Sequence, residues 1–332
     1  MLMVATHVPD TLKDGIGQLE RRVLPLAEPI PPHALWIDLI EPTREEDRKV
    51  EQFLSVSIPT REEMSDIEPS ETLYSEGGAR YMSARLFYHL DDEMADIAGI
   101  TFILTDQILV TVRYVEPLSF QMFVNRAGRP NGCGDTPEAV MAGLFETIMD
   151  RGADVLQAAG AQIDRLSRNV FADTVDPSVR NAGYQSTLRA LGRHADVISK
   201  VRESLVSVER ILLFLSASYR TARVPLEMRE RVKTTLRDVT SLEEHASFLN
   251  NKIQFLLDAT LGLVNLEQNN IIKLFSVMAV VFMPPTLIAS IYGMNFKTIP
   301  ELEWSLGYPM ALLMMVGAAV FPYVFFRWKK WL

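Results

Sequence analysis

Two long apolar runs near the C-terminal end dominate the hydrophobic pattern of this chain. Leu274 to Tyr292 and Tyr308 to Phe326 each contain 19 residues without a charged side chain. At about 1.5 Å of rise per residue, each run forms a helix of about 28 Å, which is long enough to cross the hydrocarbon core of a bilayer. We therefore predict a membrane hairpin of two helices.

Charged residues beside the two runs predict their orientation. Lys273 precedes the first run, and Arg327, Lys329 and Lys330 follow the second. Positive flanks stay on the cytoplasmic side of a membrane. The chain also starts without the basic and then apolar pattern of a signal peptide. We expect a multi-pass protein of the inner (plasma) membrane, with lipid as a partner and with both termini in the cytoplasm.

A heptad-like apolar stripe precedes the first run. No strong helix breaker follows the stripe before Pro284, so we predict one continuous helix from about Leu226 to Tyr292. A break at Gly262 or at Asn269-Asn270 is the alternative, although one glycine costs a helix only about 1 kcal/mol. The stripe consists of Val232, Leu236, Val239, Leu242, Ala246, Leu249, Ile253 and Leu256.

The first 132 residues have the pattern of an α/β domain. Strands are predicted at 34–40, at 81–89 and, as a hairpin around Asp106-Gln107, at 98–105 and 108–114. Thr43 and Glu46 have the spacing of a capping box, which predicts a helix from Thr43 to Leu54. The stretch from Ser65 to Gly78 is rich in turn residues, and we expect it to be irregular.

Two further long helices are predicted before the stripe. Thr136 and Pro137 begin one that runs toward Asp173, and Asp176-Pro177 begins another that ends near Tyr219. The fold class is therefore an α/β cytoplasmic domain followed by long α-helices and a two-helix membrane hairpin. The expected divisions are an acidic α/β domain at 1–132, a helical region at 133–225, a stalk helix at 226–273, membrane helices at 274–292 and 308–326 with an external loop at 293–307, and a basic cytoplasmic tail at 327–332.

Charge is distributed unevenly along the chain. Residues 1–132 hold 12 Lys and Arg against 22 Asp and Glu, a net charge of −10, whereas the whole chain has −9. An acidic domain of this kind argues against nucleic acid as a partner, and it suits either a solubilising surface or a domain that meets cations. The sequence shows no phosphate-binding loop, no His/Cys metal cluster and no nucleophile elbow, so we expect neither an enzyme nor an organic cofactor.

One face of the first membrane helix carries a stripe that could line a pore. Two helices cannot enclose a water-filled path, so a pore requires several copies of the chain. In an oligomer this face would give polar rings at its ends and apolar rings between them, although such stripes also serve as packing faces. The stripe consists of Asn269, Ile272, Phe275, Ala279, Met283 and Thr286.

Two motifs mark the middle and the end of this helix. Pro284-Pro285 removes two backbone donors, so the freed carbonyls need water, Thr286 or a neighbouring helix, and a simple packing kink is the alternative. Gly293 has the chemistry of a helix C-cap and Asn295 that of a turn residue. A ring of Asn295 amides at an outer pore mouth is the functional alternative. Neutral oxygens can hold hydrated Mg²⁺, which sheds its waters reluctantly.

This chain resembles the CorA magnesium transporter family. The resemblance rests on Tyr292-Gly293-Met294-Asn295-Phe296, on Pro300-Glu301-Leu302 with Trp304, and on Gly307-Tyr308-Pro309. It extends back through Glu267-Gln268-Asn269 and Phe282-Met283-Pro284-Pro285-Thr286, and forward to the basic end at Lys329-Lys330-Trp331-Leu332.

The resemblance implies a funnel-shaped homopentamer that conducts Mg²⁺, and also Co²⁺ or Ni²⁺, into the cell. It assigns Gly293, Met294 and Asn295 to an outer selectivity loop. It also places Asn269, Met283 and Thr286 at pore-facing positions. Glu301 and Glu303 would form an external acidic loop that offsets Lys297, a cation where many family members carry none.

Regulation by the cargo ion is also implied by the resemblance. Family members commonly close when cytosolic Mg²⁺ binds acidic residues between subunits, and Asp258 falls where a stalk aspartate often takes part. Its partner is expected among Glu62, Glu63, Asp66 and Glu68.

Two other functions remain open at this point. One is transport of Zn²⁺ or another transition metal, although relatives that move zinc depart from the Tyr-Gly-Met-Asn pattern. The other is a membrane-anchored coiled-coil scaffold that conducts nothing.

Overall fold

A computed structural model describes residues 1–8, 18–65, 68, 72–88, 95–129, 134–172, 177–221, 224–295 and 304–329. The chain forms two compact units, Met1–Leu257 and Asp258–Leu332, which are described separately below.

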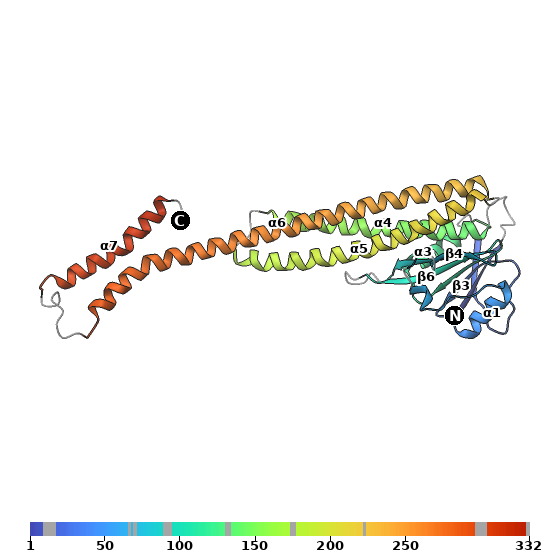
Figure 1. Cartoon of the computed structure of the whole chain (residues 1–332), viewed down its shortest axis with the longest axis horizontal. Coiled ribbons are helices and arrows are strands. Elements are labelled where there is room, and N and C mark those ends of the chain that lie inside the picture. Colours follow the sequence, from blue (N-terminus) through green and yellow to red (C-terminus); the bar gives the residue numbers. More distant parts are fainter. Residues whose placement is uncertain are drawn as a thin grey trace. The chain divides into compact units, whose positions relative to one another are not determined.

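A mixed seven-stranded sheet forms the centre of the first unit (Figure 1). Its order is β2-β1-β3-β7-β6-β5-β4, and β3 and β7 pair in parallel while the other neighbours are antiparallel. The strand at 34–40 and the hairpin around Asp106-Gln107 are confirmed. The strands are β1 Leu2–Val8, β2 Gln18–Val23, β3 Ala34–Ile40, β4 Leu73–Glu76, β5 Ala79–Phe87, β6 Ile97–Leu104 and β7 Leu109–Arg113.

Three strands were not predicted from the sequence. The first two, β1 and β2, extend the sheet beyond β3. The third, β4, lies in the stretch from Ser65 to Gly78, so the expectation that all of this stretch is irregular was wrong. The polar and small residues there form the turn of a β4–β5 hairpin, in which Gly77 and Gly78 have φ of 57° and 84°. These left-handed values favour glycine because it lacks a Cβ. The predicted strand end at His89 falls outside the described residues.

The predicted helices are present, with one addition, α3. The capping box of α1 is formed, since the Thr43 hydroxyl accepts from the Glu46 backbone N–H and the Glu46 carboxylate accepts from that of Thr43. The helices are α1 Arg44–Leu54, α3 Leu118–Ala127, α4 Pro137–Val170, α5 Pro177–Thr221, α6 Leu226–Tyr292 and α7 Gly307–Trp328, with a 3₁₀ turn at Glu63–Ser65.

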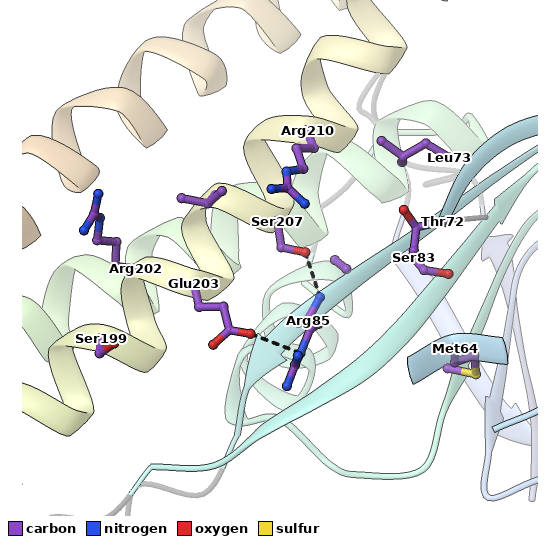
Figure 2. A pocket seen from close by; sticks show the side chains of 12 residues that line it. Met64, Thr72, Leu73, Ser83, Arg85, Ser199, Arg202, Glu203, Ser207 and Arg210 are labelled. Atoms are coloured by element: carbon purple, nitrogen blue, oxygen red, sulfur yellow. Dashed lines mark hydrogen bonds and ion pairs between the residues drawn. The ribbon is translucent and has the colours of Figure 1, made fainter. Parts of the chain in front are cut away.

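Alternation along the strands gives the sheet a hydrophobic core on each face. Trp36 of β3 packs with Phe120 and Phe123 of α3 in the cluster that α4, α5 and α6 also share. Its neighbour Ile37 points to the other face, where Val50 of α1 is buried. Helix α5 also closes part of the strand edge, because the Arg85 backbone N–H donates to the Ser207 hydroxyl at 2.7 Å (Figure 2).

The apolar stripe of α6 is the face that packs into the first unit. Val239, Ala246 and Leu256 are fully buried, and the remaining members are buried or half-buried in the same cluster. Two ion pairs with α4 flank this contact: Arg231 donates to Glu146 at 2.9 Å, and Lys252 pairs with Asp164. The helix shows no break at Gly262 or at Asn269-Asn270, so the continuous helix is confirmed.

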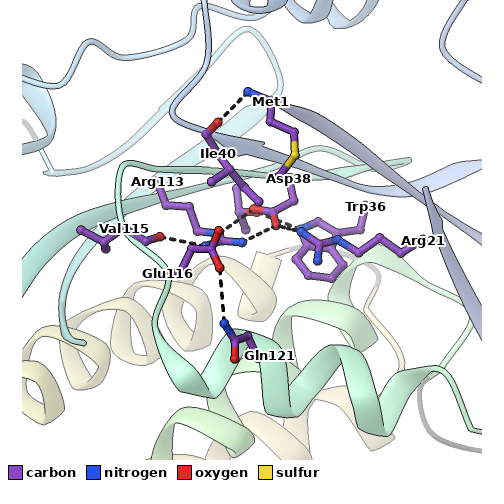
Figure 3. Close-up of polar contacts among 10 residues, drawn as sticks. Met1, Arg21, Trp36, Asp38, Ile40, Arg113, Val115, Glu116 and Gln121 are labelled. Atoms are coloured by element: carbon purple, nitrogen blue, oxygen red, sulfur yellow. Dashed lines mark hydrogen bonds and ion pairs between the residues drawn. The ribbon is translucent and has the colours of Figure 1, made fainter. Parts of the chain in front are cut away.

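A buried charge cluster joins β3 to its neighbour β7 and to the edge strand β2 (Figure 3). Asp38, which is 1% exposed, accepts two hydrogen bonds from Arg113, at 3.0 and 2.9 Å, and pairs also with Arg21 of β2. Thr111 donates to the same carboxylate at 2.8 Å and accepts from the Trp36 indole at 2.9 Å. Burial lowers the pKa of the Arg21 guanidinium because it destabilises the charged form. The Asp38 carboxylate opposes this effect, since its negative charge stabilises the buried cation.

Asp38→Asn should destabilise the first unit strongly. Removing one partner of a buried pair leaves uncompensated charge, which costs about 3–5 kcal/mol. Urea unfolding of the purified protein, followed by circular dichroism, measures this loss. The matched control is Glu28→Gln, which breaks the exposed pair with Arg22 and should cost less than about 1 kcal/mol. Equal losses in the two variants would contradict the structural role of Asp38.

Candidate functional site

The candidate site lies on α6 within the second unit, where the helix is apolar and uncovered. Two helices, α6 and α7, contain segments long and apolar enough to cross a membrane. Only 6% of the residues in each of these segments are buried within the chain. A core helix of a soluble protein hides its apolar side chains, whereas Phe275, Met283 and Leu313 are 63%, 67% and 73% exposed. Such exposed apolar side chains are stable in contact with lipid or with another protein surface.

The small amount of burial in this unit follows a helical period on both helices. On α7 the less exposed positions are Gly307, Ala311, Met315, Ala318, Ala319, Pro322 and Phe326. On α6 they are Val277, Val281, Pro284, Pro285, Ile288 and Tyr292. Spacings of three and four on both helices indicate that these faces pack against each other. This face was not predicted from the sequence, although its helical spacing and the small residues of α7 are a signal of it.

The predicted pore stripe lies on the opposite side of α6. At 100° per residue, its centre is roughly 170° from the centre of the face that carries Val277 and Ile288. All six members of the stripe are exposed: Asn269, Ile272, Phe275, Ala279, Met283 and Thr286. The chain itself therefore leaves this stripe free for contact with water or with other copies.

Pro284-Pro285 does not end the helix, which continues to Tyr292. The two prolines lack the N–H groups that would bond to the carbonyls of Val280 and Val281, four residues earlier. Thr286 was one candidate partner for those carbonyls, but its hydroxyl donates to the Phe282 carbonyl at 2.7 Å instead. A water or a neighbouring helix remains as their partner.

The Gly-Met-Asn motif follows the last helical residue directly. The Gly293 N–H donates to the Ala289 carbonyl at 2.9 Å, and the Met294 N–H donates to that of Ile291 at 3.3 Å. The left-handed conformation typical of a glycine C-cap is absent, since Gly77 and Gly78 are the glycines with positive φ among the described residues. A Cβ at Gly293 would lie 3.1 Å from the Ala289 oxygen, which is tight. Met294 and Asn295 are exposed.

Several predicted site residues are not brought together here. Lys297, Glu301, Glu303 and Asp66 fall outside the described residues. Asp258 is exposed at the start of the second unit, and Glu62, Glu63 and Glu68 are exposed in the first. Within the described ranges, no three His, Cys, Asp or Glu side chains gather as a metal-binding group. A regulatory metal site built from these carboxylates therefore stays a prediction.

A mixed sheet, long helices and two uncovered apolar helices define a membrane protein with a large soluble unit. Residues 33–330 match the family described as CorA-like Mg²⁺ transporter protein. The chain belongs to this family, which is one of transporters and not of enzymes.

Individual relatives support the same assignment. Proteins named magnesium transport protein CorA from Yersinia pseudotuberculosis and from Escherichia coli K12 are each 36% identical to this chain, over 299 and 300 residues. Each alignment covers 90% of this chain and 92% of the relative. The complete structure of the CorA magnesium transporter from Methanocaldococcus jannaschii aligns with a TM-score of 0.74, covering 100% of this chain and 99% of that one. At 16% identity, that likeness shows the shared fold.

Ala311→Phe should disturb the packing of α7 on α6. Ala311 is 7% exposed, so a larger side chain forces the two helices apart at a cost of about 1–3 kcal/mol. Thermal unfolding in detergent, read as loss of the monodisperse peak in size-exclusion chromatography, measures the effect. Val320→Phe is the matched control, because Val320 is 50% exposed on the opposite side of α7. A larger effect at Val320 than at Ala311 would contradict the assigned packing face.

Proposed function

We propose that this protein carries Mg²⁺ passively into the cytoplasm through a pore formed by several copies of α6. One observation carries the proposal: a Gly-Met-Asn motif ends the first apolar helix of a chain that matches a Mg²⁺ transporter family over residues 33–330. Relatives named as magnesium transport proteins align over 90% of the chain, so the match includes both this motif and the soluble unit.

The exposed stripe of α6 supports an oligomeric pore. Asn269 lies at one end of the stripe and Thr286 toward the other, with Ile272, Phe275, Ala279 and Met283 between them. Rings of apolar side chains can close a narrow pore by excluding water, and polar rings at the ends hold the ion's hydration shell. Because α7 covers the opposite face of α6, the proposed assembly has α6 inside and α7 outside, and a homopentamer is the family's arrangement.

Selection of the ion is assigned to Gly293, Met294 and Asn295. Mg²⁺ keeps its waters tightly, so an entrance suits it when neutral oxygens bind those waters instead of replacing them. The Asn295 amide supplies such an oxygen just beyond the end of α6. Glu301 and Glu303 in the same loop attract cations to this entrance and offset the charge of Lys297.

The proposed topology places both termini in the cytoplasm and the short loop outside. Lys273 before the first span, with Arg327 and Lys329 after the second, gives positive flanks on one side of the plasma (inner) membrane. The acidic soluble unit then meets cytosolic Mg²⁺. Regulation of the pore is assigned to Asp258 and a carboxylate of the adjacent subunit, which would bind Mg²⁺ and hold the closed state.

Asn295→Ala should abolish Mg²⁺ flux while the protein still assembles. Loss of the amide removes the group that holds the hydrated ion at the mouth, and we expect flux to fall at least tenfold. Flux into proteoliposomes measures this directly, and growth rescue of a bacterium deficient in Mg²⁺ uptake gives the cellular counterpart. Asn251→Ala is the matched control, since Asn251 is an exposed amide of α6 outside the membrane span.

The same assay separates the competing functions. Normal flux in the Asn295 variant would contradict the proposed role of Gly293, Met294 and Asn295 in ion selection. Flux of Zn²⁺ that Mg²⁺ fails to inhibit would favour a transition-metal transporter. An assembled wild-type protein that conducts no ion would favour a membrane-anchored scaffold.

Asp258→Ala should weaken the response of the closed state to cytosolic Mg²⁺. We expect millimolar Mg²⁺ to protect α6 of the wild-type oligomer from protease, and the variant to need several-fold more Mg²⁺ for half protection. The control is Glu244→Ala, which removes an exposed carboxylate elsewhere on α6. An unchanged Mg²⁺ midpoint would exclude Asp258 from regulation.

A further inference from the structure

A cavity between the sheet edge and α5 is lined by several basic side chains. It has a volume of about 350 Å³, and its walls are β5, the start of β4, the 3₁₀ turn and one face of α5 (Figure 2). Among the described residues that line it are three arginines, Arg85, Arg202 and Arg210, and one carboxylate, Glu203. One of these arginines, Arg85, comes from the acidic part of the chain, since residues 1–132 carry a net charge of −10, and the other two come from α5.

The cavity lies where the pairing of β4 with β5 ends. The pairing of β4 with β5 ends at Leu73 opposite Met82, so among the described strands β6 is the one neighbour of β5 from Ser83 onward. The Arg85 backbone N–H turns to the Ser207 hydroxyl of α5 at 2.7 Å instead. That contact fixes Arg85 and Ser207 together, and the Ser207 O–H remains able to donate to a ligand.

The three arginines of the cavity differ in how closely each is paired with a carboxylate. Arg85 pairs with Glu203 at 3.2 Å, but both side chains are nearly half exposed, at 44% and 47%. Exposed ion pairs contribute about 0–1 kcal/mol, so an incoming anion can replace Glu203 at little cost. Within the described part of the chain, Arg210 has no ion pair or hydrogen bond, and Arg202 interacts at longer range with Glu243 of α6. In Figure 2, Arg202 points away from the strands.

A second, adjoining cavity extends the basic surface. It has a volume of about 260 Å³, shares Met64 and Arg85 with the first, and adds Arg61, whose guanidinium lies 5.3 Å from the centre of the Tyr114 ring. Arg85 therefore lines both cavities. Apolar walls from Met64 and Val206 complement the guanidinium groups in the larger cavity.

We infer that the larger cavity binds a phosphorylated small molecule with an apolar part, of which nucleotides are the tested members. Guanidinium groups present paired N–H donors that match the oxygens of a phosphoryl group. Arg210 and Arg85, released from Glu203, supply this chemistry, and the Ser207 hydroxyl adds a donor. A volume of about 350 Å³ is within the usual range for small-molecule sites. This site is independent of the pore and of Mg²⁺.

Direct binding to the purified full-length protein tests the inference. Equilibrium dialysis with labelled ATP, in detergent with EDTA, excludes any effect of Mg²⁺ chelation. We expect saturable binding below millimolar concentration, and weaker binding of inorganic phosphate, which cannot use the apolar wall. Arg210→Gln should weaken ATP binding at least tenfold. Glu203→Gln should strengthen it several-fold, because Arg85 then loses its competing carboxylate.

Two controls make the outcome decisive. Arg165→Gln removes an arginine of α4 that is likewise exposed and should leave binding unchanged. Asn295→Ala, which tests the pore, should also bind ATP normally, so failure of the pore and failure of this site are distinguishable. Absence of saturable binding, equal loss in the Arg210 and Arg165 variants, or equal displacement of ATP by sulfate would overturn the inference.

Discussion

The whole structure depends on one helix that must satisfy two solvents. The first part of α6 buries an apolar stripe against α4 and α5 and exposes polar residues to water, as a soluble helix does. Its last part is apolar on every side, as a membrane requires. No loop separates the two parts, so one continuous hydrogen-bonded helix contains both the water-exposed part and the lipid-exposed part.

The second half of this helix divides its surface between two neighbours. The face with Val277 and Ile288 is covered, and the face with Phe275 and Met283 is free. A helix that was apolar all round with no such division could pack in many rotations. The covering of one side by α7 restricts the rotation of α6 and so determines which of its residues stay exposed. Small residues on α7, such as Ala311 and Ala318, permit that close contact.

Most of the fold could be predicted from local signals in the sequence. The capping box at Thr43, the hairpin around Asp106-Gln107 and the long stripe of α6 each combine a period with a boundary residue, and all are confirmed. The strand β4 was missed because its four residues mix polar and apolar types and depend on β5 for their pairing. Half of the residues in the edge strand β2 are charged, and Arg21 is stable there because it pairs with Asp38. Such long-range pairing leaves no periodic pattern in the sequence.

The candidate site was predictable to a smaller extent. The Gly-Met-Asn motif and the exposed stripe follow from sequence, but the covered face of α6 requires α7 to be placed beside it. The basic cavity could not have been found, because Arg85 and Arg210 come from elements 125 positions apart, and their meeting depends on where β4 ends.

The burial of Trp36 has a practical consequence for optical work on this protein. It is the only tryptophan before position 304, it is 1% exposed, and its indole N–H is bonded to Thr111. Because the other three tryptophans belong to the stretch after the first span, replacing them with phenylalanine would leave a single emitter within the sheet. Its emission wavelength would then report unfolding of the soluble unit, because the lipid-facing part of the same molecule would contain no tryptophan.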